Sequence, residues 1–247
     1  ITPSHDFNDY KIGKKHNLEF ISVLNLDGSI ADRDFIPVHL RGLDRFEARK
    51  EILKELEKDE LLIKEESYII QIPRGDRSGI VLEPMVTNQW FVKTESLARK
   101  AIDAVKNEKT NFIPRNWEKT YFEWLNNIQD WCVSRQIWWG HRIPAWYSGD
   151  DIYVGMSEDD VRKKYNLDKN LKLTQDEDVL DTWFSSALWP FSTFGWPEET
   201  QDLKDFYPTA LMVTGFDIIF FWVARMMMMG IEFMEEVPFK DILIHGL

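Results

Sequence analysis

Three clusters of polar side chains in this 247-residue chain have residue types and spacings that could support chemistry. In the first, Asp6 and Asp9 stand close together, with His5 beside them and His16 beyond. Histidine and aspartate bind zinc and hard divalent metals, so the cluster could be a metal-dependent hydrolase site. Without a metal, the carboxylates could hold an amino group and orient water. The composition alone favours a structural alternative, an Asx turn in which Asp6 and Asn8 cap backbone amides.

The second cluster is a run of acids followed by aromatic residues at positions 176–186. Its carboxylates could hold a cation, but for the three acids at 176–178 a solvated loop is favoured. Asp181 completes the acidic run, and Trp183 with Phe184 is apolar enough to line a pocket.

The third cluster lies at 214–222. Thr214 and Asp217 have the spacing of a capping box, which is a purely structural interpretation. However, Gly215 would let a ligand approach the backbone, and Asp217 could hydrogen-bond a ribose diol beside a helix N-terminus. Ile218 and Trp222 stand four residues apart and would share one helix face, which is more often core than pocket wall.

The segment 130–147 is the most aromatic part of the chain. It contains four of the 11 tryptophans together with Arg135, His141 and Arg142. Aromatic planes interleaved with guanidinium groups suit a site for bases or phosphates. The residue chemistry alone favours the alternative, a tryptophan-rich core helix with a few solvated charges.

The remaining patterns indicate the elements that would position these clusters. Residues 1–40 alternate short apolar runs with turn signals and predict strands and loops, and 66–82 predicts a hairpin. Helices are predicted over 44–62, 94–106 and 159–165. The tryptophans at 117, 124, 131 and 138 recur every seven residues, the spacing of one buried stripe on a helix, and Trp117 and Trp124 are assigned to it.

The last part of the chain alternates strand-like and helical segments, as a parallel α/β sheet does. Strand-like runs at 211–213 and 242–244 flank a predicted helix at 216–229, and another strand is predicted near 145–147. The most apolar run, 211–233, contains Asp217, Arg225 and Glu232, so a buried helix is favoured over a membrane span.

The composition limits the class of protein. Hydrophobic residues make up 44% of the chain, enough for a well-filled core. The single cysteine, Cys132, excludes a disulfide framework and predicts a reducing, cytoplasmic location. The net charge of −12 argues against non-specific duplex binding. Residues 109–147 carry five Lys/Arg against three Asp/Glu, so a nucleic acid would meet a local patch. Neither end resembles a natural terminus, and we expect a larger protein.

Several of these blocks together resemble the class I aminoacyl-tRNA synthetases of the valine, isoleucine and leucine subgroup. The blocks are residues 1–10, 130–147, 176–193 and 215–226. The residues at 139–147 and 181–186 are similar to those of the valine branch rather than the isoleucine branch. The resemblance implies an α/β fold: part of a β-rich inserted editing domain over 1–84, then the C-terminal half of a Rossmann-like catalytic domain over 85–247, including a helical return segment at 94–140.

The resemblance implies two active sites in the parent protein, which is expected to be a monomer. One joins valine to ATP, with Mg²⁺, and then to tRNA(Val); the other hydrolyses mischarged threonyl-tRNA. An apolar pocket excludes isoleucine by size but cannot strongly refuse threonine, which has the shape of valine. Carried over by motif, Thr2, Asp6 and Asp9 would lie in the editing pocket, where the carboxylates would hold the amino group and hydroxyl of threonine.

The same motifs assign residues to the synthetic site. Trp183, Ile218 and Trp222 would form the walls of the valine pocket. Around the adenylate, the implied residues are Gly215 and Asp217 at the ribose, and His245 and Gly246 near the adenine.

The chain departs from the family pattern in ways that limit its expected activity. It contains neither the HIGH nor the KMSKS signature, and we expect these residues alone to be inactive in aminoacylation. Some members carry zinc-binding cysteine pairs near positions 75 and 150, where this chain has none, so no zinc is predicted. The alternatives are an isoleucine-branch enzyme, a stand-alone editing hydrolase, a metal hydrolase at the His5 cluster, and a protein that only binds tRNA.

Overall fold

The computed structural model describes residues 1–246. It divides into two compact units, Ile1–Asn88 and Gln89–Leu247, called here the first and the second unit. The division falls close to the boundary after residue 84 that the sequence predicts. Each unit is described by itself.

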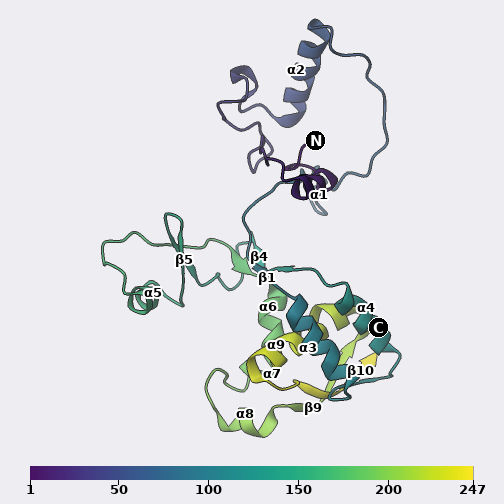
Figure 1. The fold of residues 1–247 in the computed structure, drawn as a ribbon, viewed down its shortest axis with the longest axis vertical. Coiled ribbons are helices and arrows are strands. Elements are labelled where there is room, and N and C mark those ends of the chain that lie inside the picture. The colour runs from purple at the N-terminus through teal and green to yellow at the C-terminus, as the bar shows by residue number, and fades with distance from the viewer. Residues whose placement is uncertain (247) are drawn as a thin grey trace. The chain divides into compact units, whose positions relative to one another are not determined.

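The first unit is built from helices and loops (Figure 1). It contains α1 (Phe7–His16), the short 3₁₀ helix η1 (Val38–Leu40) and α2 (Arg45–Lys58). Strand pairing within this unit is limited to isolated bridges: Leu24 with Ile30, Ser29 with Asp44, and Arg74 with Val81. Ala31, Ile36 and Leu40 form a small core in this unit. The expected β-rich character is therefore represented by bridges only.

Two predictions for the first unit need correction. Residues 7–16 form a helix instead of strands, because Asp6 caps its first amides and Asn17 ends it in the left-handed conformation. In the predicted hairpin, the turn is present: Leu82 N–H donates to the Pro73 carbonyl (2.9 Å). Its outer arm at 68–72 forms no strand and is exposed, since no described segment pairs with it. The predicted surface helix is confirmed as α2.

A parallel three-stranded sheet forms the base of the second unit. Its order is β2 (Asn111–Ile113), β10 (Phe239–His245) and β9 (Thr209–Gly215), and both pairings are parallel. The chain leaves β9, passes through helix and returns in β10, which is the crossover that parallel strands require. This confirms the strands and the parallel arrangement that the alternating pattern predicts.

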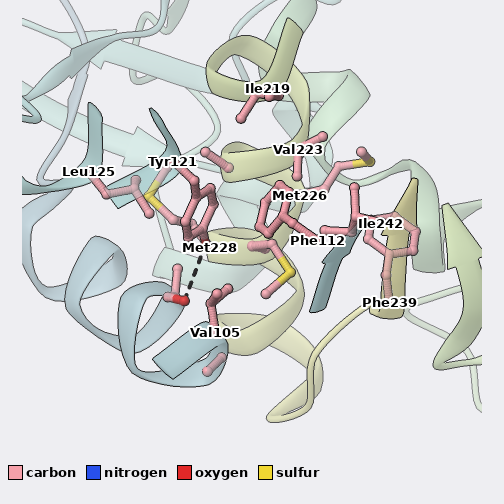
Figure 2. Packing of buried hydrophobic residues seen from close by; sticks show 14 of the residues in the cluster. Val105, Phe112, Tyr121, Leu125, Ile219, Val223, Met226, Met228, Phe239 and Ile242 are labelled. Carbon is pink, nitrogen blue, oxygen red and sulfur yellow. Dashed lines mark hydrogen bonds between the residues drawn. The ribbon is translucent and has the colours of Figure 1, made fainter. Parts of the chain in front are cut away.

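Helices α3 (Glu95–Lys106), α4 (Trp117–Asn126) and α9 (Arg225–Met234) pack against this sheet (Figure 1). Figure 2 shows the core between them, where Tyr121 of α4 lies among side chains of the other elements and donates a hydrogen bond to the Ala101 carbonyl (3.2 Å). Its other members include Phe112, Met226 and Ile242, all fully or almost fully buried. This core fixes the strands whose ends carry the predicted adenylate residues.

The segment between β9 and α9 is not a regular α-helix. It begins as a 3₁₀ turn, η2 (Phe216–Ile218), and continues as a π-helix, η3 (Ile219–Ala224). The prediction of a helix over 216–229 is confirmed in position, but not in its α-helical spacing. Short π-helical segments are rare overall, but those that occur are often found at functional sites.

A second core lies under several short elements. Its side chains come from β1 (Phe91–Val92), β3 (Trp131–Cys132), β8 (Val179–Leu180), α6 (Thr182–Ala187), α7 (Trp189–Ser192), α8 (Gln201–Phe206) and α9. A further short strand, β4 (Ser134–Arg135), adjoins these elements. β1 pairs with β3, and β4 with β8, both antiparallel.

The predicted seven-residue tryptophan stripe is helical only in its first half, and it is not a buried stripe even there, because Trp117 is half-buried and Trp124 is 52% exposed. Trp117 stacks on Phe216 and Trp124 on Phe220. The helix then ends at Asn126, Trp131 lies in a strand, and Trp138 is fully exposed in a loop. Residues 127–140 form short strands and loops and 111–113 form β2, so the predicted helical return segment at 94–140 is helical only in α3 and α4.

The remaining element is a small antiparallel sheet with one helix. Its order is β6 (Asp151–Val154), β5 (Ala145–Ser148) and β7 (Thr174–Gln175), followed in packing by α5 (Glu158–Tyr165). The strand near 145–147 and the helix near 159–165 are confirmed. Across residues 1–246, every helix is either too short or too polar to cross a lipid bilayer.

Candidate functional site

The carboxyl edge of the parallel sheet collects the four residues predicted to surround an adenylate. Gly215 ends β9 and lies opposite His245, which ends β10. Asp217 follows in η2, and Gly246 follows His245, whose Nδ1 lies 2.6 Å from the Gly246 carbonyl oxygen. In open parallel sheets, ligands bind outside the carboxyl ends of the strands. The arrangement thus meets the geometric requirement of the prediction, although their roles stay predictions.

The capping-box alternative for this segment does not describe the structure. Thr214 is buried within β9, and Gly215 occupies the N-cap of η2 without a side-chain hydrogen bond. Asp217 is exposed at the start of η2. Its carboxylate is therefore accessible at the edge where the strands end.

Two of the three predicted pocket walls lie on elements that contact each other. Trp183 is on α6 and Trp222 on the π-helix η3, and these elements pack together. The indole nitrogen of Trp222 donates to the Ser186 carbonyl of α6 (3.1 Å), and Trp183 stacks on Phe221 with ring centroids 5.7 Å apart. Both tryptophans are half-buried, as pocket walls must be.

Ile218 lies at the junction between η2 and η3 and is also half-buried. The prediction placed Ile218 and Trp222 on one face because residues four apart share a face of an α-helix. Here Ile218 is the N-cap of a π-helix, so that spacing rule does not apply. Ile218 is linked to the Trp222 wall because it is the residue directly before η3.

Asp181 holds the start of α6 in place. The residue is 6% exposed, and its side chain caps α6 by accepting from the amide of Trp183 (3.4 Å). The Oδ2 atom accepts a hydrogen bond from the Trp131 indole (2.9 Å) and pairs with Arg135 (3.0 Å). The last acid of the predicted acidic run is therefore a structural anchor beneath the Trp183 wall.

The prediction of a solvated loop is also wrong for Asp176. Its Oδ2 accepts hydrogen bonds from the indole of Trp90 (2.8 Å) and the hydroxyl of Tyr147 (2.6 Å). Burial raises the pKa of Asp176, but the hydrogen bonds from Tyr147 and Trp90 outweigh it and the net pKa is lowered. The residue joins the small antiparallel sheet to the segment that opens the second unit.

Arg225 is the residue that sequence reasoning missed. It is only 7% exposed, its guanidinium carbon lies 4.0 Å from the Trp131 ring centroid, and its Nη1 is 3.6 Å from Asp181 Oδ2. Burial lowers its pKa to about 10, partly offset by Asp181, so it stays charged at neutral pH. One arginine within the apolar run 211–233 was the available signal, since a buried charge requires a partner.

The tryptophan-rich segment does not interleave its own rings and guanidinium groups. Arg135 donates to the carbonyls of Cys132 and Ser134, and Arg142 donates to those of Gln175 and Asp176. The predicted stacking of a guanidinium group on a tryptophan occurs between Trp131 and Arg225, which lies outside the segment. The pair borders an open cavity of about 360 Å³, whose lining includes Trp124, Arg135, Phe220, Arg225 and Met228.

In the first unit, the N-terminal end of α1 gathers the three predicted editing residues. Asp6 Oδ1 accepts from the amides of Asn8 and Asp9, both at 2.9 Å. Asp9 Oδ2 accepts from the backbone amide of Thr2 (2.6 Å) and from its hydroxyl (3.2 Å). The structural alternative is thus correct for Asp6, which caps the helix. Both hydrogen bonds to Asp6 use Oδ1 and both hydrogen bonds to Asp9 use Oδ2, so one oxygen of each carboxylate is left to accept from a ligand.

His5 is committed to backbone hydrogen bonds. Its Nε2 accepts from the Val23 amide (3.0 Å), so its Nδ1 must donate to the Pro84 carbonyl (3.0 Å). Both ring nitrogens are therefore occupied, which disfavours the metal-hydrolase alternative. Within residues 1–246, no three His, Cys, Asp or Glu side chains form a group that could hold a metal. A pocket of about 330 Å³ in this unit is lined by Thr2, His5, Arg45, Arg49 and Glu83 among apolar residues.

The sequence has close relatives. Residues 7–247 match the family "tRNA synthetases class I (I, L, M and V)". The chain is 58% identical over 248 residues to a valine–tRNA ligase of Legionella pneumophila (strain Paris). It is 55% identical over 248 residues to one of Coxiella burnetii and 58% identical over 248 residues to one of Francisella tularensis subsp. tularensis. Each alignment covers 100% of this chain and 27% of the relative.

Proposed function

Because this chain belongs to the class I tRNA synthetase family (I, L, M and V), we propose that it forms part of an ATP-dependent ligase that joins valine to tRNA(Val). The observation that carries the proposal is the identity of 55–58% to valine–tRNA ligases over the whole chain. The chain spans about a quarter of the length of these relatives, so the activity is proposed for the protein that contains it.

In this proposal the second unit binds valine and its adenylate. Trp183, Ile218 and Trp222 form an apolar pocket that accepts a small branched side chain and excludes a larger one by size. Gly215 and Asp217 contact the ribose, since Asp217 is exposed at the edge where β9 ends. His245 and Gly246, opposite and beyond Gly215, lie near the adenine. ATP enters with Mg²⁺, and these residues bind and orient it.

The test uses a chimera in which these 247 residues replace the matching segment of the Legionella pneumophila relative. Valine-dependent ATP–pyrophosphate exchange is the readout. We expect exchange with valine and much weaker exchange with isoleucine; preference for isoleucine would favour the isoleucine-branch alternative. Trp222→Ala in the chimera should raise the valine KM, with Trp138→Ala as the control, because Trp138 is fully exposed in a loop.

The first unit is proposed to act in editing, through Thr2, Asp6 and Asp9. The support is that α1 brings the three together, with Asp9 held by Thr2 and Asp6 beside them. In the chimera, Asp9→Asn should let threonyl-tRNA(Val) accumulate while valine exchange is unchanged. Glu19→Gln, an exposed acid, is the control. Equal deacylation by both variants would remove Asp9 from the proposal.

The isolated chain is proposed to be inactive in aminoacylation. It lacks both signatures that handle the ATP phosphates in the family, and no other group here replaces that stabilisation of the transition state. Valine-dependent exchange by the isolated chain would contradict this statement. Deacylation of threonyl-tRNA(Val) by the isolated chain would instead support the stand-alone editing alternative.

A further inference from the structure

Two elements that carry proposed pocket walls are joined at their ends by one ion pair. Asp181 is the N-cap directly before α6, which carries Trp183. Arg225 directly follows η3, which carries Trp222. Their side chains meet with Arg225 Nη1 at 3.6 Å from Asp181 Oδ2. The pair therefore connects the start of one wall element to the end of the other.

Both members of the pair are fixed by other contacts. Asp181 is held by the Trp131 indole and by its own amide, which donates to the Val133 carbonyl (2.7 Å). Arg225 lies against the face of Trp131, with the rings of Phe220 and Phe221 each 5.5 Å from its guanidinium carbon. Trp131 thus contacts both members, and the three side chains form one connected cluster.

The stability of the fold does not by itself account for this charge. Nη1 of Arg225 is buried and makes no hydrogen bond within residues 1–246. Replacing a buried ion pair by well-packed apolar groups is often neutral or stabilising, because two charges no longer have to leave water. Asp181 would still be paired with Arg135 if Arg225 were apolar. The guanidinium therefore has a cost that packing does not require.

We propose that Arg225 is a positioning residue for the amino-acid pocket: by pairing with Asp181 and stacking on Trp131, it fixes the separation of Trp183 and Trp222. The inference rests on the proposed function and deepens it, because it adds a residue that sets specificity without touching the amino acid. Loss of the pair would let α6 and η3 shift against each other. A shift of that kind widens the slot, which weakens valine binding and admits isoleucine more readily.

The first experiment measures geometry in the isolated chain. Tryptophan indole NMR resonances are compared between the unchanged chain and Arg225→Met, which keeps an unbranched apolar side chain. We expect the Trp183 and Trp222 resonances to move together, while that of Trp146, bonded to the Gly155 carbonyl in the small sheet, stays in place. Arg162→Met is the matched control, since Arg162 is a partly buried arginine paired with Glu158 on α5. Unmoved Trp183 and Trp222 resonances would overturn the proposal.

The second experiment measures selection in the chimera by ATP–pyrophosphate exchange. Arg225→Met should raise the valine KM about tenfold, change kcat less than about threefold, and reduce the preference for valine over isoleucine about tenfold. Arg225→Lys, which keeps the charge facing Asp181, should raise the KM less. A valine KM and a preference within about twofold of the unchanged chimera, with only a lower melting temperature, would show a merely structural role. If the chimera that keeps Arg225 shows no exchange, the proposed function is contradicted. The indole shifts of the isolated chain would still test whether Arg225 positions Trp183 and Trp222.

Discussion

The two units hold their predicted site residues by different physical means. In the second unit, the residues lie at the ends of strands and on short helices that are fixed by two hydrophobic cores. In the first unit, they lie at one end of α1 and are held by capping and backbone hydrogen bonds, and the core of this unit is only Ala31, Ile36 and Leu40. Both sites use hydrogen bonds, but only the site of the second unit also has large hydrophobic cores to hold it. The first unit should therefore open at lower free-energy cost.

The sharpest way to test this comparison is to make one substitution in each core. Ile242→Ala in β10 removes a completely buried side chain, and we expect a loss of about 2–5 kcal/mol in the free energy of unfolding. Ile36→Ala in the first unit should cost less, because a small core collapses more easily around the cavity. Denaturant unfolding of both variants measures the difference. Equal costs would mean that the first unit is packed as tightly as the second.

A backbone substitution gives the next largest effect in the second unit. Gly140 has φ +152°, and a Cβ there would lie 2.9 Å from Val179 Cγ2. Gly140→Ala should cost about 1–3 kcal/mol, from backbone strain and from displacement of β8. Gly149→Ala, where φ is +60° and the added Cβ meets nothing within 4 Å, has only the milder strain of the left-handed region and no such contact, so it should cost less. An equal or larger loss of unfolding free energy at Gly149 would contradict this prediction.

Hydrogen bonding in the first unit is tested at His5. His5→Ala removes the acceptor of the Val23 amide and the donor to the Pro84 carbonyl, so we expect a loss of about 1–2 kcal/mol. His16→Ala, at the exposed end of α1, should cost a few tenths at most. Thermal unfolding of the two variants provides the comparison. If they unfold alike, the hydrogen bonds of His5 do not hold this unit together.

The smallest effect concerns pH. The pKa of Asp176 is lower in the folded chain than its unfolded value of about 4, so the stability it contributes is present above that pH and is lost as the pH falls further. Asp176→Asn should therefore make unfolding less sensitive to acid, and Glu177→Gln, an exposed neighbour, should not. The urea concentration at the midpoint of unfolding is measured from pH 6 to pH 3. The same decrease towards pH 3 in the unchanged chain and in Asp176→Asn would contradict the prediction.

The success of prediction from sequence followed the range of the interactions. The helix α2 and the strands β9 and β10 follow from local periodic patterns and turn signals, and the strand–helix–strand order predicts that the two strands are parallel. The parallel pair also accounts for the meeting of Gly215 and His245, since strand ends of one direction share an edge.

The failures came from contacts that no local pattern records. Trp131 continues a seven-residue repeat, but pairing of β3 with β1 outweighs helical spacing there. The pairing of Arg225 with Asp181 is equally non-local, so a lone charge in an apolar run indicated burial without naming the partner. Helix α1 was missed because it is short and depends on its caps.

The π-helical turn of η3 makes this part of the chain unusually intolerant of changes in length. Removing one residue from 219–224 would let an ordinary α-helix form, with more favourable local geometry. The same deletion would turn every side chain on one side of it by about 100° around the axis. Trp222 could then no longer donate to Ser186 while Arg225 reaches Asp181. A sequence that shortens this turn would gain a more regular helix, but the Trp222–Ser186 and Arg225–Asp181 contacts could no longer form at the same time.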